Sequence, residues 1–154
     1  MVEVFDNFLD SEEIYHLQQI QHPWAFQGSN KSNPYNLPFL YAAPPKGEPY
    51  FYEYLFRKIE NNIGKHSINR VYFNGQCYGQ DGSFHVDNCD KTVLIYVSPY
   101  DREWGGFTQV GEEIIAPITG RMIAFDGNTS HKGFSFSRQT SPMRISLAYK
   151  LNFL

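Results

Sequence analysis

The spacing of hydrophobic residues predicts two helices in the first part of the chain. In residues 10–22, apolar side chains recur at positions 14, 17 and 20, which is the spacing of one helix face, and Asp10 with Glu13 fits a capping box. A second helix is expected to begin near Pro49, because apolar side chains at positions 51, 55, 59 and 63 keep helical spacing until Gly64. Both patterns describe helices that bury one face.

Between these helices, residues 27–49 break any regular pattern. The segment holds five of the chain's nine prolines, together with several asparagine and glycine residues. Long loops inside a compact domain tend to be functional, so we interpret this one as a candidate lid over a substrate. Its Tyr35, Phe39 and Tyr41 could clasp a peptide. The alternative is that these aromatic side chains pin the loop to the body of the domain.

After residue 66 the hydrophobic period changes to two, which predicts a β domain. Turn signals such as GQDG and DGN separate the short runs. Strands are expected at residues 69–78, 83–88, 91–98, 105–110, 112–116, 120–126, 130–136 and 143–152. Eight short strands favour a mainly β fold, a double-stranded β-helix or jelly roll in which two sheets pack face to face and one open end holds a ligand. The two helices would brace one outer sheet.

Length and composition fit a single domain. The chain has 154 residues, and 42% of them are hydrophobic and 17% aromatic, which supplies a packed interior. We expect one domain over residues 1–154. Residues 1–65 would form the supporting helices and the lid-like loop, and residues 66–154 would form the jelly-roll core.

The charge pattern argues against nucleic acid as a substrate. The formal net charge is -3 and no run of lysine or arginine occurs, whereas nucleic-acid-binding proteins usually carry a basic stripe. Four arginines could still line a local groove, although the simpler interpretation is that they are solvated surface residues. They are Arg70, Arg102, Arg121 and Arg138.

Targeting signals and cysteine usage point to a cytoplasmic protein. The first residues, MVEVFDNFLDSEE, are acidic where a signal peptide is basic, and no stretch approaches the ~20 apolar residues of a membrane span. Cys77 and Cys89 are too few for a disulfide framework and form no CxxC pair, which argues against a zinc-thiolate site and fits a reducing compartment. We therefore expect no membrane partner.

The motif His85-Val86-Asp87 is the sharpest candidate for chemistry. In a strand, residues i and i+2 point to the same face and can bind one metal ion together. His131 is the best placed third ligand, because it follows the predicted strand GRMIAFD. Two imidazoles and one carboxylate form the facial triad typical of non-haem iron(II) oxygenases. Zinc is the chief competitor, and a lone HxD also occurs by chance. The other histidines, His16, His22 and His66, are expected to be surface residues.

Arg144 adds a second candidate. The last predicted strand, MRISLAYKL, places Arg144, Ser146 and Ala148 on one face. If that face points into the sandwich, the guanidinium is buried and needs an anionic partner, for which a dicarboxylate offers a bidentate match. Ser146 could donate to the same carboxylate. If the face points to solvent, Arg144 is an ordinary surface residue.

Taken in order, these motifs resemble the Fe(II)/2-oxoglutarate-dependent oxygenases of the prolyl 4-hydroxylase-like branch. The resemblance runs through nearly the whole chain and is carried by VEVFDNFLDSEEI, RVYFNGQCYGQDGSFHVD, WGGFTQV, GRMIAFDGNTSH and MRISLAY. It implies that His85, Asp87 and His131 hold a catalytic iron and that Arg144 binds the distal carboxylate of 2-oxoglutarate. It also implies Fe(II) as cofactor, 2-oxoglutarate and O2 as co-substrates, and ascorbate as a candidate additional cofactor.

Other residues are matched by the resemblance less directly. Tyr78 and Tyr96 look similar to tyrosines that contact 2-oxoglutarate in such enzymes, and their alternative role is core packing. The sequence neighbours of His131, which are Asp126, Asn128 and Thr129, could contact the ligands, although a turn is the simpler role for DGN.

The chain departs from the branch pattern in the interval before Arg144 and in the arginine itself, where many members have lysine. Arg144 follows His131 by 13 residues, a longer interval than in the animal oxygen-sensing prolyl hydroxylases, and SFSRQTSP suggests an extended loop. Because Asp87 is retained, hydroxylation is favoured over halogenation.

The resemblance implies hydroxylation of an unactivated C–H bond. Prolyl residues of a peptide or protein are the leading substrate. A free amino acid or other small molecule is the first alternative, followed by oxidative dealkylation of nucleic acid and by a jelly-roll binding module without turnover. The sequence does not predict the oligomeric state.

Overall fold

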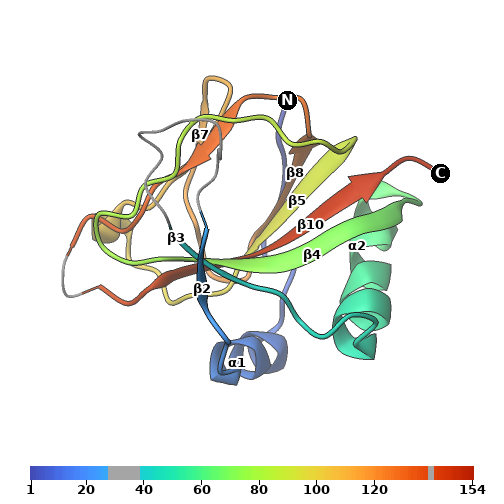
Figure 1. Ribbon diagram of the computed structural model, residues 1–154, viewed down its shortest axis with the longest axis horizontal. Coiled ribbons are helices and arrows are strands. Elements are labelled where there is room, and N and C mark those ends of the chain that lie inside the picture. Colours follow the sequence, from blue (N-terminus) through green and yellow to red (C-terminus); the bar gives the residue numbers. More distant parts are fainter. Residues whose placement is uncertain (28–38, 139–140) are drawn as a thin grey trace.

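The fold is built from two antiparallel sheets and two helices (Figure 1). The computed structural model describes residues 1–27, 39–138 and 141–154. The large sheet has the order β1-β8-β5-β10-β4-β3-β2, and the small sheet has the order β7-β6-β9. This arrangement confirms the predicted mainly β jelly-roll architecture.

The strands are short except for the two at the centre of the large sheet. They are β1 (Glu3–Phe5), β2 (Ala25–Gln27), β3 (Phe39–Ala42), β4 (Ser67–Gln76), β5 (Lys91–Tyr96), β6 (Thr108–Val110), β7 (Glu113–Ile115), β8 (Met122–Asp126), β9 (His131–Gly133) and β10 (Arg144–Asn152). The helices are α1 (Ser11–Gln19), a π-helical turn η1 (Tyr50–Leu55) that continues into α2 (Phe56–Ile63), and a 3-10 turn η2 (Arg102–Trp104).

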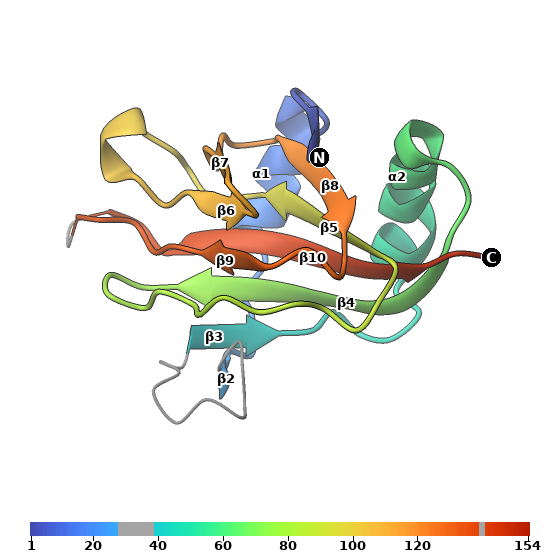
Figure 2. The same cartoon turned by 90° about the horizontal axis from the view of Figure 1, so that it is seen from above.

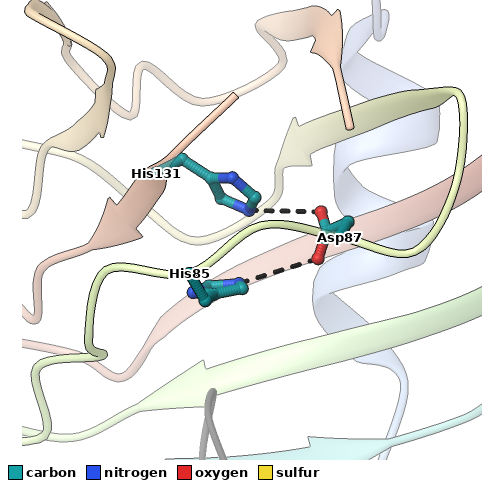
Figure 3. Close-up of side chains that lie close together, drawn as sticks. All are labelled: His85, Asp87 and His131. Atoms are coloured by element: carbon teal, nitrogen blue, oxygen red, sulfur yellow. Dashed lines mark ion pairs between the residues drawn. The ribbon is translucent and has the colours of Figure 1, made fainter. Parts of the chain in front are cut away.

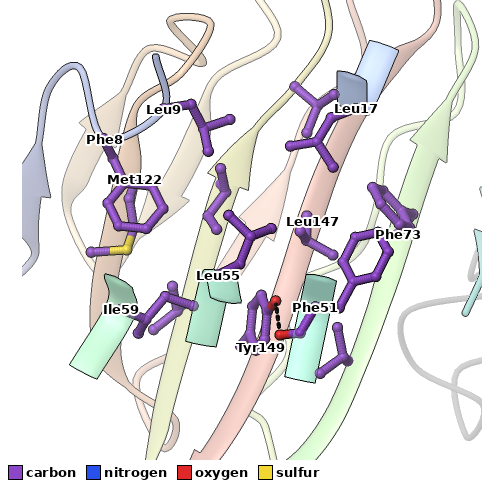
Figure 4. Packing of buried hydrophobic residues seen from close by; sticks show 14 of the residues in the cluster. Phe8, Leu9, Leu17, Phe51, Leu55, Ile59, Phe73, Met122, Leu147 and Tyr149 are labelled. Atoms are coloured by element: carbon purple, nitrogen blue, oxygen red, sulfur yellow. Dashed lines mark hydrogen bonds between the residues drawn. The ribbon is translucent and has the colours of Figure 1, made fainter. Parts of the chain in front are cut away.

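Both helices pack on one face of the large sheet, and the small sheet lies over the other face (Figures 1 and 2). Alternation along β10 explains this layering. Leu147 and Tyr149 point to the helices, where they meet Leu17, Leu55 and Ile59 in the main hydrophobic cluster (Figure 4). The intervening side chains point to the small sheet. The prediction that the helices brace one sheet is therefore confirmed.

Most of the predicted elements are present, with ends that differ by a few residues. The predicted strand at 83–88 is wrong, because only His85 pairs there, in an isolated antiparallel bridge with His131. In the described residues ten strands form rather than eight, because β1, β2 and β3 precede the predicted β region and the strand at 83–88 is absent. Short runs with no clear alternation carry too little periodic signal to identify such edge strands.

The lid hypothesis falls only partly within the described residues. Residues 28–38, including Tyr35, lie outside them. Phe39 lines the main cavity, and the Tyr41 ring packs against Tyr72 with 5.2 Å between ring centroids. Tyr41 therefore pins β3 to the sheet, whereas Phe39 faces the space where a ligand would bind. In the described part of the chain, no helix combines the length and apolar character that crossing a membrane requires.

The capping box at the start of α1 also anchors α2. The Asp10 carboxylate accepts from the Glu13 backbone N–H at 2.8 Å, and Glu13 accepts from the Asp10 N–H at 2.9 Å. Glu13 is only 5% exposed. Its carboxylate also accepts hydrogen bonds from the Lys58 ammonium at 2.7 Å and from the Tyr54 hydroxyl at 2.7 Å. Burial raises the pKa of Glu13, but the hydrogen bonds from Lys58, Asp10 and Tyr54 outweigh it and hold the pKa below its usual value.

We predict that Glu13→Gln lowers the free energy of unfolding by about 1–3 kcal/mol at pH 7, because charged hydrogen bonds to Lys58 are lost. A carboxyl with a lowered folded pKa stabilises the fold above its unfolded pKa and loses that contribution as the pH falls. The loss of unfolding free energy caused by Glu13→Gln should therefore become smaller below about pH 4.5. Urea unfolding at several pH values measures it. The exposed neighbour Glu12→Gln is the control and should change stability by less than about 0.5 kcal/mol. A deficit that does not change with pH would contradict the role of the ionised carboxylate.

Candidate metal centre

Three side chains with metal-binding atoms converge between the two sheets (Figure 3). His85 and Asp87 come from the segment between β4 and β5, and His131 is the first residue of β9. The backbones of His85 and His131 pair through two hydrogen bonds of 3.1 and 2.9 Å, and the Asp87 N–H donates to Gly127 O at 2.8 Å. These backbone bonds hold the HxD segment beside β9, although the HxD segment itself is not a strand.

The spacing of the ligand atoms suits one metal ion. One ligand atom from each residue lies within 4.8 Å of the others. His131 Nε2 lies 3.2 Å from Asp87 Oδ2, and His85 Nε2 lies 3.7 Å from Asp87 Oδ1. Ligands at about 2.0–2.2 Å from a metal and at right angles lie about 3 Å apart, so small side-chain movements complete such a site.

Both imidazoles present the atom that a metal requires. His85 Nδ1 lies 2.8 Å from Ser83 O, and His131 Nδ1 lies 2.8 Å from Thr129 O. A carbonyl oxygen can only accept, so each Nδ1 donates its proton there, and Nε2 is the ring atom that faces Asp87. Burial, with the neighbouring His131, lowers the pKa of His85, which keeps its imidazole neutral near pH 7.

Asp87 is held as a carboxylate by two further side chains. Thr92 Oγ1 donates to Asp87 Oδ2 at 2.6 Å, and the Lys150 ammonium pairs with the same oxygen. Burial raises the pKa of Asp87, but the hydrogen bond from His131 and the charge of Lys150 outweigh it and hold the pKa far below its usual range. An ionised, oriented carboxylate with two imidazoles is the donor set of a non-haem iron(II) site.

Arg144 lies at the first residue of β10 and is only 2% exposed. Its guanidinium donates from Nε to Gly106 O at 2.7 Å, from NH1 to Gln76 Oε1 at 2.9 Å and from NH2 to Thr108 Oγ1 at 2.8 Å. All three acceptors are neutral, and among the described residues no carboxylate pairs with Arg144. Burial lowers the pKa of Arg144, which shows the cost of burying this charge. A buried cation without a counter-ion is the feature expected of an anion site.

Two glycines lie beside the Arg144 side chain. A Cβ at Gly133 would lie 3.6 Å from Arg144 NH1 and 3.3 Å from Gln76 Oε1. Gly106 has φ +73°, and a Cβ there would meet the Phe136 ring at 2.5 Å. The second glycine of the WGG motif therefore lets the backbone approach closely enough to accept from Arg144.

The three candidate metal ligands and Arg144 line one cavity of about 290 Å3. Its walls come from both sheets and from the HxD segment. The lining residues are Phe39, Arg70, Tyr72, Asn74, Gln76, Gly82, His85, Val86, Asp87, Asn88, Leu94, Thr108, His131, Gly133, Arg144, Ser146 and Lys150. The arrangement gives a small space with the three candidate metal ligands on one wall and the buried cation of Arg144 on another.

The other predicted site residues have different outcomes. Ser146 is buried and lines the cavity. Tyr96 is buried behind the lining, donates its hydroxyl to Thr108 Oγ1 at 2.7 Å and lies beneath the Arg144 guanidinium, 5.5 Å from ring centroid to Cζ. Tyr78 is 55% exposed and is not among the lining residues. Ser146 therefore lines the cavity. Tyr96 contacts the lining residue Thr108 without lining the cavity itself, and Tyr78 lies outside the cavity.

Of the three sequence neighbours of His131 considered as contacts of the ligands, one supports His131. Thr129 supports the ligand through its backbone carbonyl, whereas Asp126 closes the turn by accepting from the Thr129 N–H at 3.0 Å. Asn128 is exposed. The remaining histidines pack against aromatic rings away from the site, His16 on Tyr50, His22 on Trp24 and Phe73, and His66 on Phe153.

Sequence reasoning missed four residues that hold the site together. Thr92 and Lys150 contact Asp87, and Gln76 and Thr108 contact Arg144. Lys150 had a usable signal, because it continues the row of Arg144, Ser146 and Ala148 on one face of the predicted last strand. The other three depend on which strands are neighbours, and a single sequence does not show that.

Comparison with known proteins identifies the fold. No protein-family model and no curated protein matches the sequence. Among solved structures, the chain resembles a 2OG-Fe(II) oxygenase family oxidoreductase from Burkholderia pseudomallei, with a TM-score of 0.72, 12% identity, and coverage of 98% of this chain and 84% of that chain. A prolyl-4-hydroxylase from Pseudomonas putida gives a TM-score of 0.70, 12% identity, and coverage of 99% and 92%.

A third similar structure contains the expected co-substrate. The viral collagen prolyl hydroxylase of Paramecium Bursaria Chlorella virus-1, described in complex with 2OG, gives a TM-score of 0.69, 18% identity, and coverage of 99% of this chain and 96% of that chain. At these identities the likeness establishes the shared fold. What this chain does must be argued from its own site.

We predict that Thr92→Val weakens Mn2+ binding by about 10–100-fold, because the hydroxyl that orients Asp87 is lost while the side-chain shape is kept. Asp87→Ala should abolish specific binding. Calorimetry with Mn2+ measures both. Thr119→Val is the matched control, since Thr119 Oγ1 donates only to Ser98 O, outside the site. Unchanged affinity in Asp87→Ala would show that the metal binds elsewhere.

Proposed function

We propose that the protein is an Fe(II)- and 2-oxoglutarate-dependent dioxygenase. One observation carries the proposal: a buried arginine without a counter-ion and a His-Asp-His triad line the same small cavity. Neither feature alone is specific, because the triad donor set also suits zinc and a buried arginine can serve structure. Together they match a molecule that chelates a metal at one end and presents a carboxylate at the other.

The cavity fits 2-oxoglutarate in size and in polarity. Its volume of about 290 Å3 lies at the lower end of ligand pockets, which are typically about 300–1,000 Å3. Arg144 would hold the C5 carboxylate, and Thr108 and Ser146 are neighbouring hydroxyls that can donate to it. His85, Asp87 and His131 would hold the iron to which the 2-oxo acid end binds.

Iron bound at this triad would supply the oxygen chemistry, in which O2 converts 2-oxoglutarate to succinate and CO2 and places one oxygen atom in a substrate C–H bond. The protein's own residues keep this chemistry productive. Thr92 and Lys150 fix the orientation and charge of Asp87, and the backbone carbonyls of Ser83 and Thr129 fix both imidazoles. Arg144 sets the depth at which the co-substrate lies.

A prolyl residue in a peptide or protein is the proposed substrate. Two of the similar structures are described as prolyl hydroxylases, which favours this class by analogy of fold. Phe39 and Tyr72 give the cavity an aromatic wall suited to a prolyl ring. A free amino acid is the alternative substrate, and the cationic hollow described in the next section would accept its carboxylate as well as that of an acidic peptide.

The other function classes fit the molecule less well. Of the four arginines considered for a nucleic-acid groove, only Arg70 lines the cavity, while Arg121 pairs with Asp6 and Arg138 with Glu103. A binding module without turnover would have no need for an oriented triad next to a buried cation.

Turnover should require both halves of the site. With Fe(II), O2, ascorbate to keep the iron reduced, and 2-oxoglutarate, we expect succinate formation that stops in Asp87→Ala. Arg144→Gln should raise the KM for 2-oxoglutarate by about 30-fold or more, because a buried charge pair is broken. Mass spectrometry of succinate, and of proline-containing peptides that gain one oxygen atom, gives the readout.

The control for Arg144→Gln is Arg138→Gln, which removes an exposed ion pair with Glu103 and should leave the KM unchanged. Succinate formation that persists in Asp87→Ala, together with an unchanged KM for 2-oxoglutarate in Arg144→Gln, would refute the assignment of the site. Peptides that stay unmodified while succinate forms would refute only the prolyl substrate.

A further inference from the structure

A smaller hollow opens beside the candidate metal centre and continues the main cavity. It has a volume of about 200 Å3 and is lined by Asn69, Arg70, Asp87, Asn88 and Lys150. Four of these residues also line the main cavity, so the two spaces share a wall at the metal ligand Asp87. Every lining residue is polar or charged. This end of the site therefore suits a polar part of a ligand, in contrast to the aromatic wall at Phe39.

Arg70 is the cation in this hollow that has no counter-ion. Arg144 makes three hydrogen bonds and Lys150 pairs with Asp87, whereas no carboxylate pairs with Arg70 in the described part of the chain. The Arg70 guanidinium instead lies over the ring of Tyr72, 4.4 Å from the ring centroid. Tyr72 is 7% exposed, so its ring is held by packing while Arg70 lies over it. Stacking holds the guanidinium plane while its N–H groups stay available.

The position of Arg70 in the sheet directs it toward the site. In β4, residues 70, 72, 74 and 76 share one face, and all four line the cavity. Gln76 pairs with Arg144 across the β4–β10 ladder, and Arg70 pairs with Lys150 at the other end of the same ladder. The row thus runs from the anion-binding wall at Arg144, past the metal ligands, to Arg70.

The lining carries more positive charge than the ligands considered so far would neutralise. Among the residues that line the two spaces, three are cations and Asp87 is the only carboxylate. A divalent metal and a dicarboxylate cancel each other, so the lining stays cationic when both are bound. An uncompensated positive wall attracts a further anion, and the guanidinium fork matches a carboxylate in a bidentate manner.

We propose that Arg70 binds a carboxylate of the substrate and so places the neighbouring C–H bond at the metal centre. This inference rests on the proposed dioxygenase function and names a chemical feature of its substrate. The carboxylate belongs either to a free amino or imino acid or to an acidic residue next to the target residue of a peptide. Asn69 and Asn88 supply further polar groups in the same hollow.

Two matched pairs of probes test the proposal on the protein loaded with Mn2+ and 2-oxoglutarate. The first pair is L-proline and L-prolinamide, and the second is acetyl-Pro-Glu-amide and acetyl-Pro-Gln-amide. Within each pair only the carboxylate differs. Calorimetry should show at least about tenfold tighter binding of the carboxylate member in one pair. A preference in the first pair identifies a free acid, and a preference in the second identifies an acidic peptide.

The preference should disappear in Arg70→Gln and remain in Arg57→Gln. Arg57 is an exposed arginine of α2, on the opposite face of the large sheet, and makes a matched control. The ratio within a pair is the readout, so a general change in metal or co-substrate binding cancels. The proposal is overturned if neither pair shows a carboxylate preference in the native protein, or if the preference survives Arg70→Gln.

Failure of this inference can be told apart from failure of the proposed function. If succinate forms in an Asp87-dependent manner while the carboxylate preference is absent, the dioxygenase assignment stands and the role of Arg70 is wrong. If the preference depends on Arg70 but no succinate forms, Arg70 recognises an anion and the dioxygenase assignment is wrong.

Discussion

The buried guanidinium of Arg144 is the constraint on which the arrangement of the site depends. A cation that is 2% exposed depends on partners within the protein, and Arg144 donates three hydrogen bonds to acceptors in two other segments. Gln76 ends β4, Gly106 precedes β6, and Thr108 begins β6. These bonds tie the large sheet to the small sheet at one end of the sandwich. Because every acceptor is neutral, the bonds fix the guanidinium without neutralising it, and its charge remains available to a ligand.

Hydrogen bonds with neighbouring groups also orient the side chains of the candidate metal centre. Each ligand atom is held by a group outside the triad: carbonyl oxygens hold the imidazoles, and Thr92 with Lys150 holds the Asp87 carboxylate. Lys150 and Arg144 share one face of β10 with Ser146 between them. One strand therefore places a cation at the metal ligand and another at the anion-binding wall, and its opposite face packs on the helices. Packing of Leu147 and Tyr149 in the core thereby fixes the direction of the functional side chains.

Much of this site could be predicted from sequence because its signals are local. The pair His85 and Asp87 needs only a two-residue spacing, and the alternation of β10 alone places Arg144 and Ser146 together. Prediction failed where tertiary structure decides. The HxD segment is held by backbone bonds to β9 and to Gly127 rather than by its own strand pattern, so the strand expected at 83–88 does not form. Gln76 takes the place beside Arg144, and Tyr78, two residues further, has left the strand and is exposed. The end of a strand and the register of its neighbours are set by the whole fold.

The central claim is that one molecule bridges the triad and Arg144. A crystal structure of the protein with Mn2+ and 2-oxoglutarate tests it most directly. The account predicts a metal bound by His85 Nε2, Asp87 and His131 Nε2, chelated by the 2-oxo acid end of a molecule whose C5 carboxylate contacts Arg144. A metal located away from these three residues, or a 2-oxoglutarate that does not contact Arg144, would contradict it.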